Sequence, residues 1–161
     1  MKLIKKIFNG VSLLQCDYFE DNRGFLVKTF FDKKNSGFKF TPRDEYFSIS
    51  KKNVLRGLHF QIPPYDHDKV VSCVHGSVLD VLLDLRSGPS FGKVMSIELS
   101  SDKKYILYIP KGIAHGFLSL ENNSILHYKT STIYSPSHDK GILWNSIDYD
   151  WPIEEPILSK R

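Results

Sequence analysis

The chain has 161 residues, of which 41% are hydrophobic and 25% are charged. This size and balance are typical of one globular domain and exclude a disordered or fibrous protein, so we expect residues 1–161 to form a single domain. The net charge is +4, but the basic residues are scattered in pairs such as Lys51-Lys52, which disfavours nucleic-acid binding. Apolar runs stay well below the ~20 residues of a membrane-spanning helix, so no membrane association is expected.

The first residues and the cysteines bear on the cellular compartment. Residues 1–10 contain three lysines but neither a continuous apolar segment nor a small-residue cleavage site, so no export signal is expected. Cys16 and Cys73 stand far apart without paired spacing, which favours two reduced thiols over a disulfide framework. These features predict a cytoplasmic protein.

Short runs rich in β-branched and aromatic residues recur along the chain between turn signals. The expected strands, in chain order, are 24–31, 54–60, 69–74, 78–85, 92–99, 105–109, 116–120 and 124–130. Compact turn sequences separate them, such as Gly-Pro-Ser at 88–90 and Pro-Lys-Gly at 110–112. No amphipathic helix of three turns is visible. Many short strands at close spacing favour an antiparallel sandwich or a closed barrel, in which closure removes exposed strand edges.

The sequence lacks the motifs of most familiar enzyme classes, including a Gly-rich phosphate loop, a Gly-x-Ser-x-Gly elbow and a His-Glu-x-x-His helix. The segment Ile109-Pro-Lys-Gly-Ile-Ala-His-Gly-Phe117 resembles the second motif of the cupin barrels. In metal-binding cupins the first motif supplies a His-x-His pair and a glutamate. Here His59 is followed by Phe60 and Gln61, and the next histidine is His67, so no bound metal is expected.

A wider set of motifs resembles the dTDP-4-dehydrorhamnose 3,5-epimerase family. The matching segments keep the same order and spacing over most of the chain: 21–25, 48–61, 69–76, 80–86, 90–92, 109–117, 128–129, 134–136, 142–145, 151–152 and 156–159. The resemblance implies an all-β fold, a cupin-type antiparallel β-barrel or jelly roll with short peripheral segments. It also implies an isomerase that inverts C3, C5 or both in a nucleotide-linked 4-keto-6-deoxyhexose, without a metal or redox cofactor.

The chemistry of that family suggests roles for three residues. The C4 ketone makes the C3 and C5 protons acidic, because removing either one leaves an enolate. Such a reaction needs a base, a group that stabilises the enolate and an acid on the opposite face. The resemblance places the base at His59, the stabilising ammonium at Lys69 and the acid at Tyr128. Histidine suits a base because its reference pKa of about 6.5 leaves much of it neutral at pH 7.

The resemblance also implies a substrate-binding set and a homodimer. The positions that match binding residues of the family are Arg23, Ser48, Ser50, Arg56, His115 and Tyr134. Arginine is suited to bidentate contacts with diphosphate oxygens, so the implied partner is a nucleotide-diphosphate sugar. In the family, N-terminal strands cross to the second subunit, and Arg23 is then expected to reach the neighbouring subunit's site.

Two positions depart from the family pattern. The family commonly has Gln-x-Asn before the Ser-x-Ser segment, used around the nucleotide base, whereas this chain reads Asp44-Glu45-Tyr46-Phe47. An aspartate that orients the histidine base follows the family's Leu-Ser motif, but this sequence reads Leu158-Ser-Lys-Arg161. A weak or altered enzyme, a substitute carboxylate and a truncated chain all fit this difference. The terminal carboxylate of Arg161 is one hypothetical substitute, and Asp80 or Asp84 is the internal alternative.

Other functions stay open at the level of sequence. A 3,4-ketoisomerase would use the same enolate but return the proton to a different atom. A catalytically silent sugar-nucleotide-binding module would account for the missing aspartate. A small metal-dependent cupin oxygenase would rest only on His59 and His115.

Overall fold

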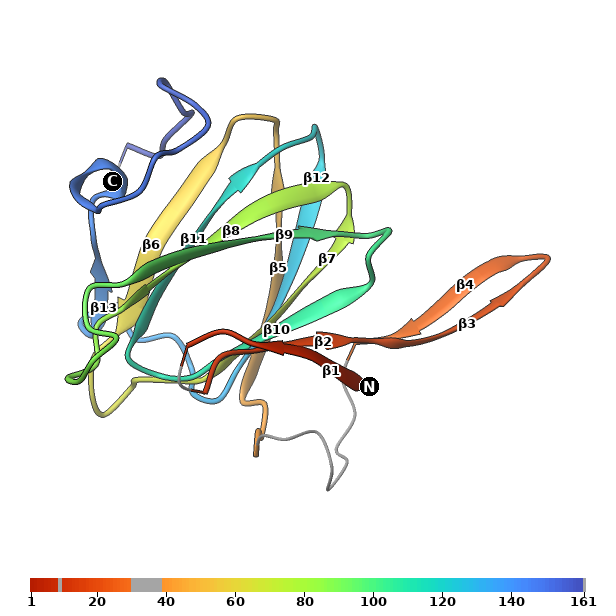
Figure 1. Ribbon diagram of the computed structural model, residues 1–161, viewed down its shortest axis with the longest axis horizontal. Coiled ribbons are helices and arrows are strands. Elements are labelled where there is room, and N and C mark those ends of the chain that lie inside the picture. Colours follow the sequence, from red (N-terminus) through yellow and green to blue (C-terminus); the bar gives the residue numbers. More distant parts are fainter. Residues whose placement is uncertain (9, 30–38, 161) are drawn as a thin grey trace.

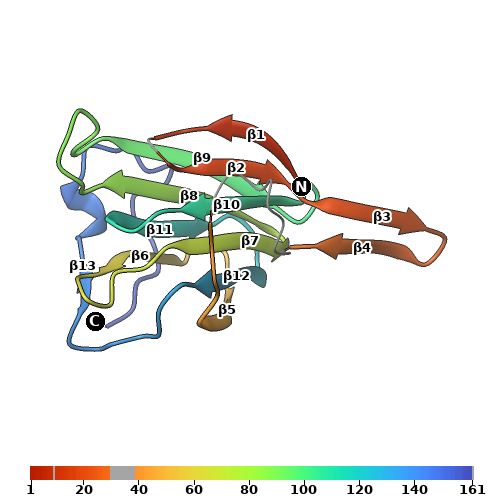
Figure 2. The same cartoon turned by 90° about the horizontal axis from the view of Figure 1, so that it is seen from below.

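The structure is a computed structural model that describes residues 1–8, 10–29 and 39–160. Two antiparallel sheets face each other (Figures 1 and 2). The six-stranded sheet contains, in spatial order, β1 (Lys2–Lys6), β2 (Ser12–Gln15), β10 (Tyr105–Ile109), β7 (Lys69–His75), β12 (Ser124–Thr130) and β5 (Asp44–Ser50). The five-stranded sheet contains β13 (Asp139–Gly141), β6 (Leu55–Gln61), β11 (Ile113–Ser119), β8 (Ser77–Asp84) and β9 (Val94–Ser100).

A third element stands apart from these two sheets. Strands β3 (Asp17–Asp21) and β4 (Gly24–Lys28) form a hairpin that projects from the body of the molecule (Figure 1). The one helical element among the described residues is a short 3₁₀ turn at Trp144–Ser146. Within the same part of the chain, no helix is long and apolar enough to cross a membrane.

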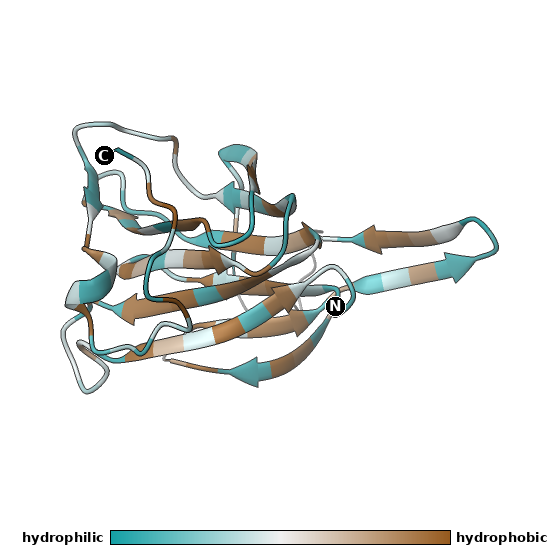
Figure 3. Cartoon of the chain, turned by 90° about the horizontal axis from the view of Figure 1, so that it is seen from above, coloured by the Kyte–Doolittle hydropathy of each residue, from teal (hydrophilic) through white to brown (hydrophobic). Residues whose placement is uncertain are grey.

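The main core lies between the two sheets. Successive side chains of a strand point to opposite faces of its sheet, so one face of every strand can point inward. Hydrophobic residues are frequent along the strands of both sheets (Figure 3). Leu126 and Tyr128 of β12 point inward from the six-stranded sheet and meet Leu82 of β8 and Phe117 of β11 from the other sheet. Burying one such leucine or phenylalanine contributes about 1.5–3 kcal/mol to folding. The core thereby holds the two sheets at a fixed distance.

The outer face of the five-stranded sheet is also covered. Val81 and Leu83 of β8 point outward there and pack under Trp144, Tyr149 and Trp151 of the C-terminal segment. The Trp151 indole nitrogen donates a hydrogen bond to the Trp144 carbonyl, which ties the segment together. Strand β8 is therefore buried on both faces, which explains why apolar residues occupy both of its faces, at Val78, Leu79 and 81–83.

The all-β prediction is confirmed, and each of the eight expected strands overlaps an observed one. Strands β10 and β12 have the expected bounds, 105–109 and 124–130. The expected strand 24–31 corresponds to β4, and its residues 30 and 31 lie outside the described residues. The strands that the sequence did not predict are β1, β2, β3, β5 and β13. Strands β1 and β5 lie at edges of the six-stranded sheet and β13 at an edge of the other, where mixed polar composition is tolerated.

Candidate active site

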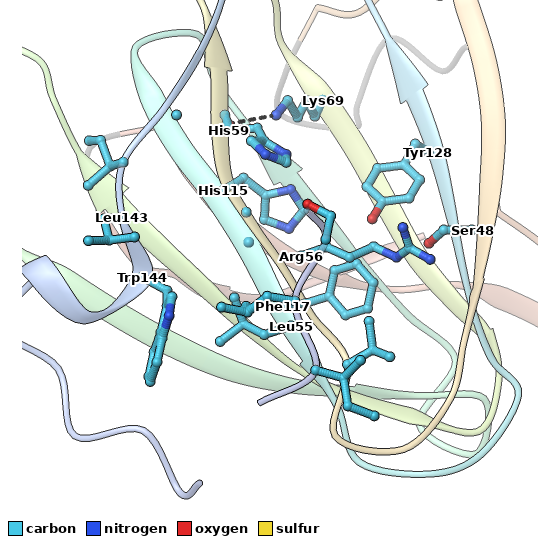
Figure 4. Close-up of a pocket in the computed structure, with 18 of the residues that line it drawn as sticks. Ser48, Leu55, Arg56, His59, Lys69, His115, Phe117, Tyr128, Leu143 and Trp144 are labelled. Atoms are coloured by element: carbon cyan, nitrogen blue, oxygen red, sulfur yellow. Dashed lines mark hydrogen bonds between the residues drawn. The ribbon is translucent and has the colours of Figure 1, made fainter. Parts of the chain in front are cut away.

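A cavity of about 680 Å³ opens between the two sheets. It contains six of the nine site residues expected from the sequence (Figure 4): Ser48, Arg56, His59, Lys69, His115 and Tyr128. His59, Arg56 and His115 come from β6 and β11 of the five-stranded sheet, whereas Ser48, Lys69 and Tyr128 come from β5, β7 and β12 of the other. Polar groups from both sheets thus face one space.

An unusually close approach of β6 and β11 places the histidines side by side. A Cβ atom on Gly57 would lie 2.4 Å from the Gly116 Cα, so a side chain cannot fit between these backbones. Gly57 also has φ +117, a conformation that residues other than glycine rarely adopt. His59 is the direct cross-strand partner of His115, and the register shifts just beyond this pair. The two glycines therefore position both histidines at the cavity wall.

His115 is held from behind by a buried carboxylate. Both Asp80 oxygens lie 2.9 Å from the His115 Nε2, and both side chains are almost completely buried. A carboxylate at this distance fixes which ring nitrogen carries a proton and orients the ring. Asp84, the other internal candidate for pairing with His59, accepts hydrogen bonds from Arg86 and Ser90. Asp80 and Asp84 are thus each engaged with other side chains.

Lys69 is a buried amine beside His59. Its side chain is 7% exposed, and its Nζ donates a hydrogen bond to the His59 carbonyl at 3.2 Å (dashed in Figure 4). Burial lowers the pKa of Lys69 to about 8, while the charges of Asp139 and Asp80 act in the opposite direction. At neutral pH the amine is therefore protonated, but it changes charge only slightly above that range.

Tyr128 faces the same cavity from the opposite sheet. Its ring stacks on that of Tyr46, with centroids 4.8 Å apart and planes at 18°. It also meets the His115 ring edge-on at 6.1 Å. Burial raises the pKa of Tyr128 well above its ordinary value, against the effect of the adjoining Ser48 hydroxyl, so the phenol stays protonated. A protonated phenol inside a cavity can donate a proton or a hydrogen bond.

Arg56 is oriented by the neighbouring strand β5. Its Nε donates to the Ser50 Oγ at 3.1 Å, and its Nη2 donates to the Ile49 carbonyl at 3.3 Å. The Ser50 side chain is buried behind the guanidinium. Ser48 lines the cavity itself, whereas Ser50 accepts the hydrogen bond that orients Arg56.

Comparison with known proteins identifies the family. The family model described as dTDP-4-dehydrorhamnose 3,5-epimerase matches residues 5–161. The chain belongs to this family. A dTDP-4-dehydrorhamnose 3,5-epimerase of Shigella flexneri is 41% identical over 167 residues, which cover 100% of this chain and 92% of that protein.

Solved structures of the family share the fold. A dTDP-4-dehydrorhamnose 3,5-epimerase from Bacillus anthracis, with TDP and PPi bound, superposes with a TM-score of 0.94 at 36% identity, covering 98% of this chain and 94% of that one. An epimerase from Legionella pneumophila in complex with dTDP-4-keto-L-rhamnose gives a TM-score of 0.91 at 32% identity, with coverage of 99% and 88%. These matches confirm the expected jelly-roll architecture.

Tyr134 lines a second, smaller cavity of about 370 Å³. This cavity shares Tyr46, His59 and Lys69 with the first, so the two adjoin at the histidine. Tyr134 is 58% exposed, and its hydroxyl donates to Asp139 at 3.5 Å. The sequence analysis did not name Asp139 or Tyr46 as site residues, because neither lies in a segment that matches the family.

Arg23 is not brought to the cavity within one subunit. It lies in the turn of the projecting β3–β4 hairpin, its side chain is 86% exposed, and its guanidinium pairs with Asp21 at 2.6 Å. Of the nine expected site residues, seven line one of the two adjoining cavities, Ser50 contacts Arg56 beside them, and Arg23 does neither. Its predicted role therefore requires a second subunit.

The C-terminal segment docks against the cavity. Leu55 N–H donates to the Ile157 carbonyl at 3.0 Å, and Ile157 N–H donates to the Asn53 carbonyl at 2.8 Å. Ile157, Leu158 and Ser159 consequently form part of the cavity wall that also contains His59. In the sequence these residues belong to the segment 156–159 that matches the family, without an assigned role at the site. The hypothetical carboxylate at Arg161 lies outside the described residues.

The oxygenase alternative depends on whether metal-ligating side chains gather near His59 and His115. Across the described ranges of the chain, no three His, Cys, Asp or Glu side chains come together as a metal site. His115 instead has Asp80 as its partner. Within the described residues, His59 and His115 are thus not joined by a third side chain in a metal-ligating group.

Proposed function

We propose that this protein inverts C3 and C5 of a dTDP-linked 4-keto-6-deoxyhexose through enolate intermediates. Family membership makes it an isomerase of nucleotide-linked 4-keto-6-deoxy sugars. The observation that carries the assignment of roles is that His59 and Tyr128 reach one cavity from two different sheets. A carbon centre is inverted only when a proton leaves from one face and another arrives on the opposite face.

His59 acts as the base in this proposal. It removes the proton from C3 or C5, and the C–H bonding electrons form the enolate double bond as the negative charge moves to the C4 oxygen. His115, its cross-strand neighbour, contacts the substrate rather than the reacting proton. The His115–Asp80 hydrogen bond fixes the orientation of that contact.

Lys69 stabilises the enolate. A buried ammonium interacts with a developing oxyanion much more strongly than a solvated one does, because little water screens the charge. The pKa of about 8 means that Lys69 carries this charge at neutral pH. No carbon changes its overall oxidation level in the two inversions, so the proposed reaction needs no redox cofactor.

Tyr128 supplies the proton on the face opposite His59. The phenolic O–H bond breaks as a new C–H bond forms at the enolate carbon, and the phenolate then regains a proton from solvent. Because burial strongly disfavours the phenolate, Tyr128 is fully protonated before each transfer. The same geometry serves C3 and C5 in turn.

The diphosphate and the nucleoside are assigned to residues around the rim. Arg56 is exposed on one side and held by Ser50 on the other, which suits a bidentate contact with phosphate oxygens. Ser48 and Tyr134 add hydroxyl groups in the two adjoining cavities. The ligands bound in the Bacillus and Legionella relatives support a thymidine diphosphate sugar as the substrate.

A homodimer completes the site in this proposal. The β3–β4 hairpin exposes four large apolar side chains, each between 48% and 61% accessible: Tyr18, Phe19, Phe25 and Leu26. Apolar groups gathered on a projecting element are typical of an interface. Docking of the hairpin on a second copy would bring Arg23 to the partner's cavity. The two free buried cysteines support the cytoplasm as the compartment.

Mixing two inactive variants tests the shared site. If Arg23 serves the neighbouring subunit, a dimer of Arg23→Ala and His59→Asn chains contains one intact site. Random pairing at equal amounts then restores about a quarter of wild-type activity, since half of the dimers are mixed and half of their sites are intact. No recovery after subunit exchange, verified by mass spectrometry of the mixed dimer, places Arg23 outside the partner's site.

Solvent deuterium exchange tests the reaction itself. The protein is incubated with dTDP-4-keto-6-deoxyglucose in D₂O, and the product is followed by NMR. The proposal predicts deuterium at both C3 and C5 with inversion at each carbon. Movement of the ketone from C4 to C3 would identify a 3,4-ketoisomerase instead. Tight binding of the sugar nucleotide without any exchange would identify a silent binding module.

A further inference from the structure

Tyr46 is placed beside Tyr128 by strand register. The two residues are direct partners across the antiparallel pair β5–β12, so their side chains leave the same face of the sheet. Their rings stack at 4.8 Å with planes at 18°. Strand β5 is the edge of the six-stranded sheet, and Tyr46 is therefore the last aromatic ring on that side of Tyr128 within the sheet.

The Tyr128 ring is enclosed by two aromatic neighbours of different kinds. Tyr46 covers one ring face, and the His115 ring approaches edge-on at 6.1 Å and 62°. His115 is itself immobilised by Asp80 and by its backbone partner His59. Together these contacts restrict the movement of the phenol, whose hydroxyl points toward the cavity (Figure 4).

We propose that Tyr46 is a positioning residue for Tyr128. The Tyr46 ring holds the Tyr128 phenol at the angle needed to protonate the enolate on the face opposite His59. This inference rests on the proposed function, in which Tyr128 is the acid. Proton removal by His59 and stabilisation by Lys69 involve other side chains, so losing Tyr46 should impair proton delivery more than proton removal. The ratio of inversion to isotope exchange measures this difference.

The contributions of the Tyr46 hydroxyl and of the Tyr46 ring can be separated by substitution. Tyr46 is 45% exposed, and its partial burial together with the charges of Asp44 and Asp139 raises the pKa of its phenol above the ordinary value. The phenol is therefore a neutral group that also borders the smaller cavity. Stacking needs only the ring, so Tyr46→Phe preserves the contact with Tyr128, whereas Tyr46→Leu keeps apolar bulk and Tyr46→Ala removes the side chain.

The experiment measures two rates for the same dTDP-4-keto-6-deoxyglucose sample in D₂O: deuterium entry at C3 and C5, and appearance of the inverted sugar. Tyr46→Leu and Tyr46→Ala are expected to lower inversion about tenfold, which corresponds to about 1.4 kcal/mol and lies near the top of the range for aromatic pairs. Deuterium entry should stay within about twofold of the wild type. Tyr46→Phe should keep both rates within the same limits.

Phe91→Ala is the matched control, because it removes an aromatic ring that is 66% exposed and borders neither of the two site cavities. It should change neither rate, and thermal unfolding of every variant checks that the fold survives. Equal loss of exchange and inversion in Tyr46→Leu, or no loss at all, overturns the inference. So does a Tyr46→Phe variant that behaves like Tyr46→Leu. Absence of exchange in the wild type overturns the proposed function and the role of Tyr128 with it.

Discussion

The two facing sheets contribute opposite halves of the proposed chemistry. The five-stranded sheet presents the proposed base His59 and its neighbour His115, whereas the six-stranded sheet presents Lys69 and the proposed acid Tyr128. Inversion requires a proton to leave one face of the sugar ring and to return on the other. A two-sheet fold supplies this arrangement directly, because a ring bound between the sheets exposes one face to each.

The two halves are held in place by different means. On the five-stranded sheet, the Gly57–Gly116 backbone contact and the His115–Asp80 hydrogen bond fix the positions. On the six-stranded sheet, burial and ring stacking determine where Tyr128 points. The first half is thus sensitive to backbone changes, and the second to changes in side-chain packing and charge.

Removal of the base should have the largest effect. His59→Asn keeps a polar side chain of similar size but cannot accept the C3 or C5 proton, so exchange at both carbons should fall by about 10²–10⁴-fold, the usual contribution of a general base. NMR in D₂O measures both positions in one sample. If the variant keeps half or more of wild-type exchange at either carbon, the base lies elsewhere.

The backbone contact should matter next. A methyl group on Gly57 would lie 2.4 Å from the Gly116 Cα, and Gly57 has a φ of +117. Gly57→Ala should therefore lower the free energy of unfolding by about 3 kcal/mol. Gly88→Ala is the control, since Gly88 also has positive φ but has no atom within 4 Å of its added methyl. Urea denaturation compares them, and similar losses in both would show that φ alone is responsible.

The charge on Lys69 should set an upper pH limit. With a pKa of about 8, Lys69 is protonated below that pH and neutral above it, so its stabilisation of the enolate is lost as pH rises. At pH 9 about a tenth of the lysine remains charged, and kcat/KM should fall roughly tenfold from its plateau.

The Lys69→Arg variant tests whether the loss of activity at high pH comes from Lys69 or from another titrating group. Arginine stays protonated through this range, so the residual activity of the variant should show no decline centred near pH 8. An identical decline in the wild type and the variant would assign it to another group. A wild-type profile that is flat to pH 9 would show that the ammonium is not needed.

Most buried strands could be predicted from the sequence, although the short buried strand β2 was not. Strands β8, β10 and β12 have continuous or alternating apolar residues, because packing partners cover them. Strand β5 was missed because it is an edge strand whose Asp44, Glu45 and two serines resemble loop composition. Its place was determined by pairing with β12, a long-range contact without a local signal.

The site could be predicted in part through motif resemblance. Matching motifs located His59, Lys69 and Tyr128, and the structure brings all three to one cavity. The Asp80–His115 pair and the Tyr46–Tyr128 stack depend on strand register, which joins residues 35 and 82 positions apart in the chain. Position 46 also departs from the family pattern, so resemblance could not assign it a role.

The division of labour between the sheets is tested most directly by Tyr128→Phe, which removes one hydroxyl and leaves the base and Lys69 intact. In D₂O with dTDP-4-keto-6-deoxyglucose, the account predicts that deuterium still enters C3 or C5, while inverted sugar forms about 10²-fold more slowly than with the wild type. Formation of the inverted sugar at the wild-type rate would contradict the account, because the acid would then not be supplied by the six-stranded sheet at Tyr128.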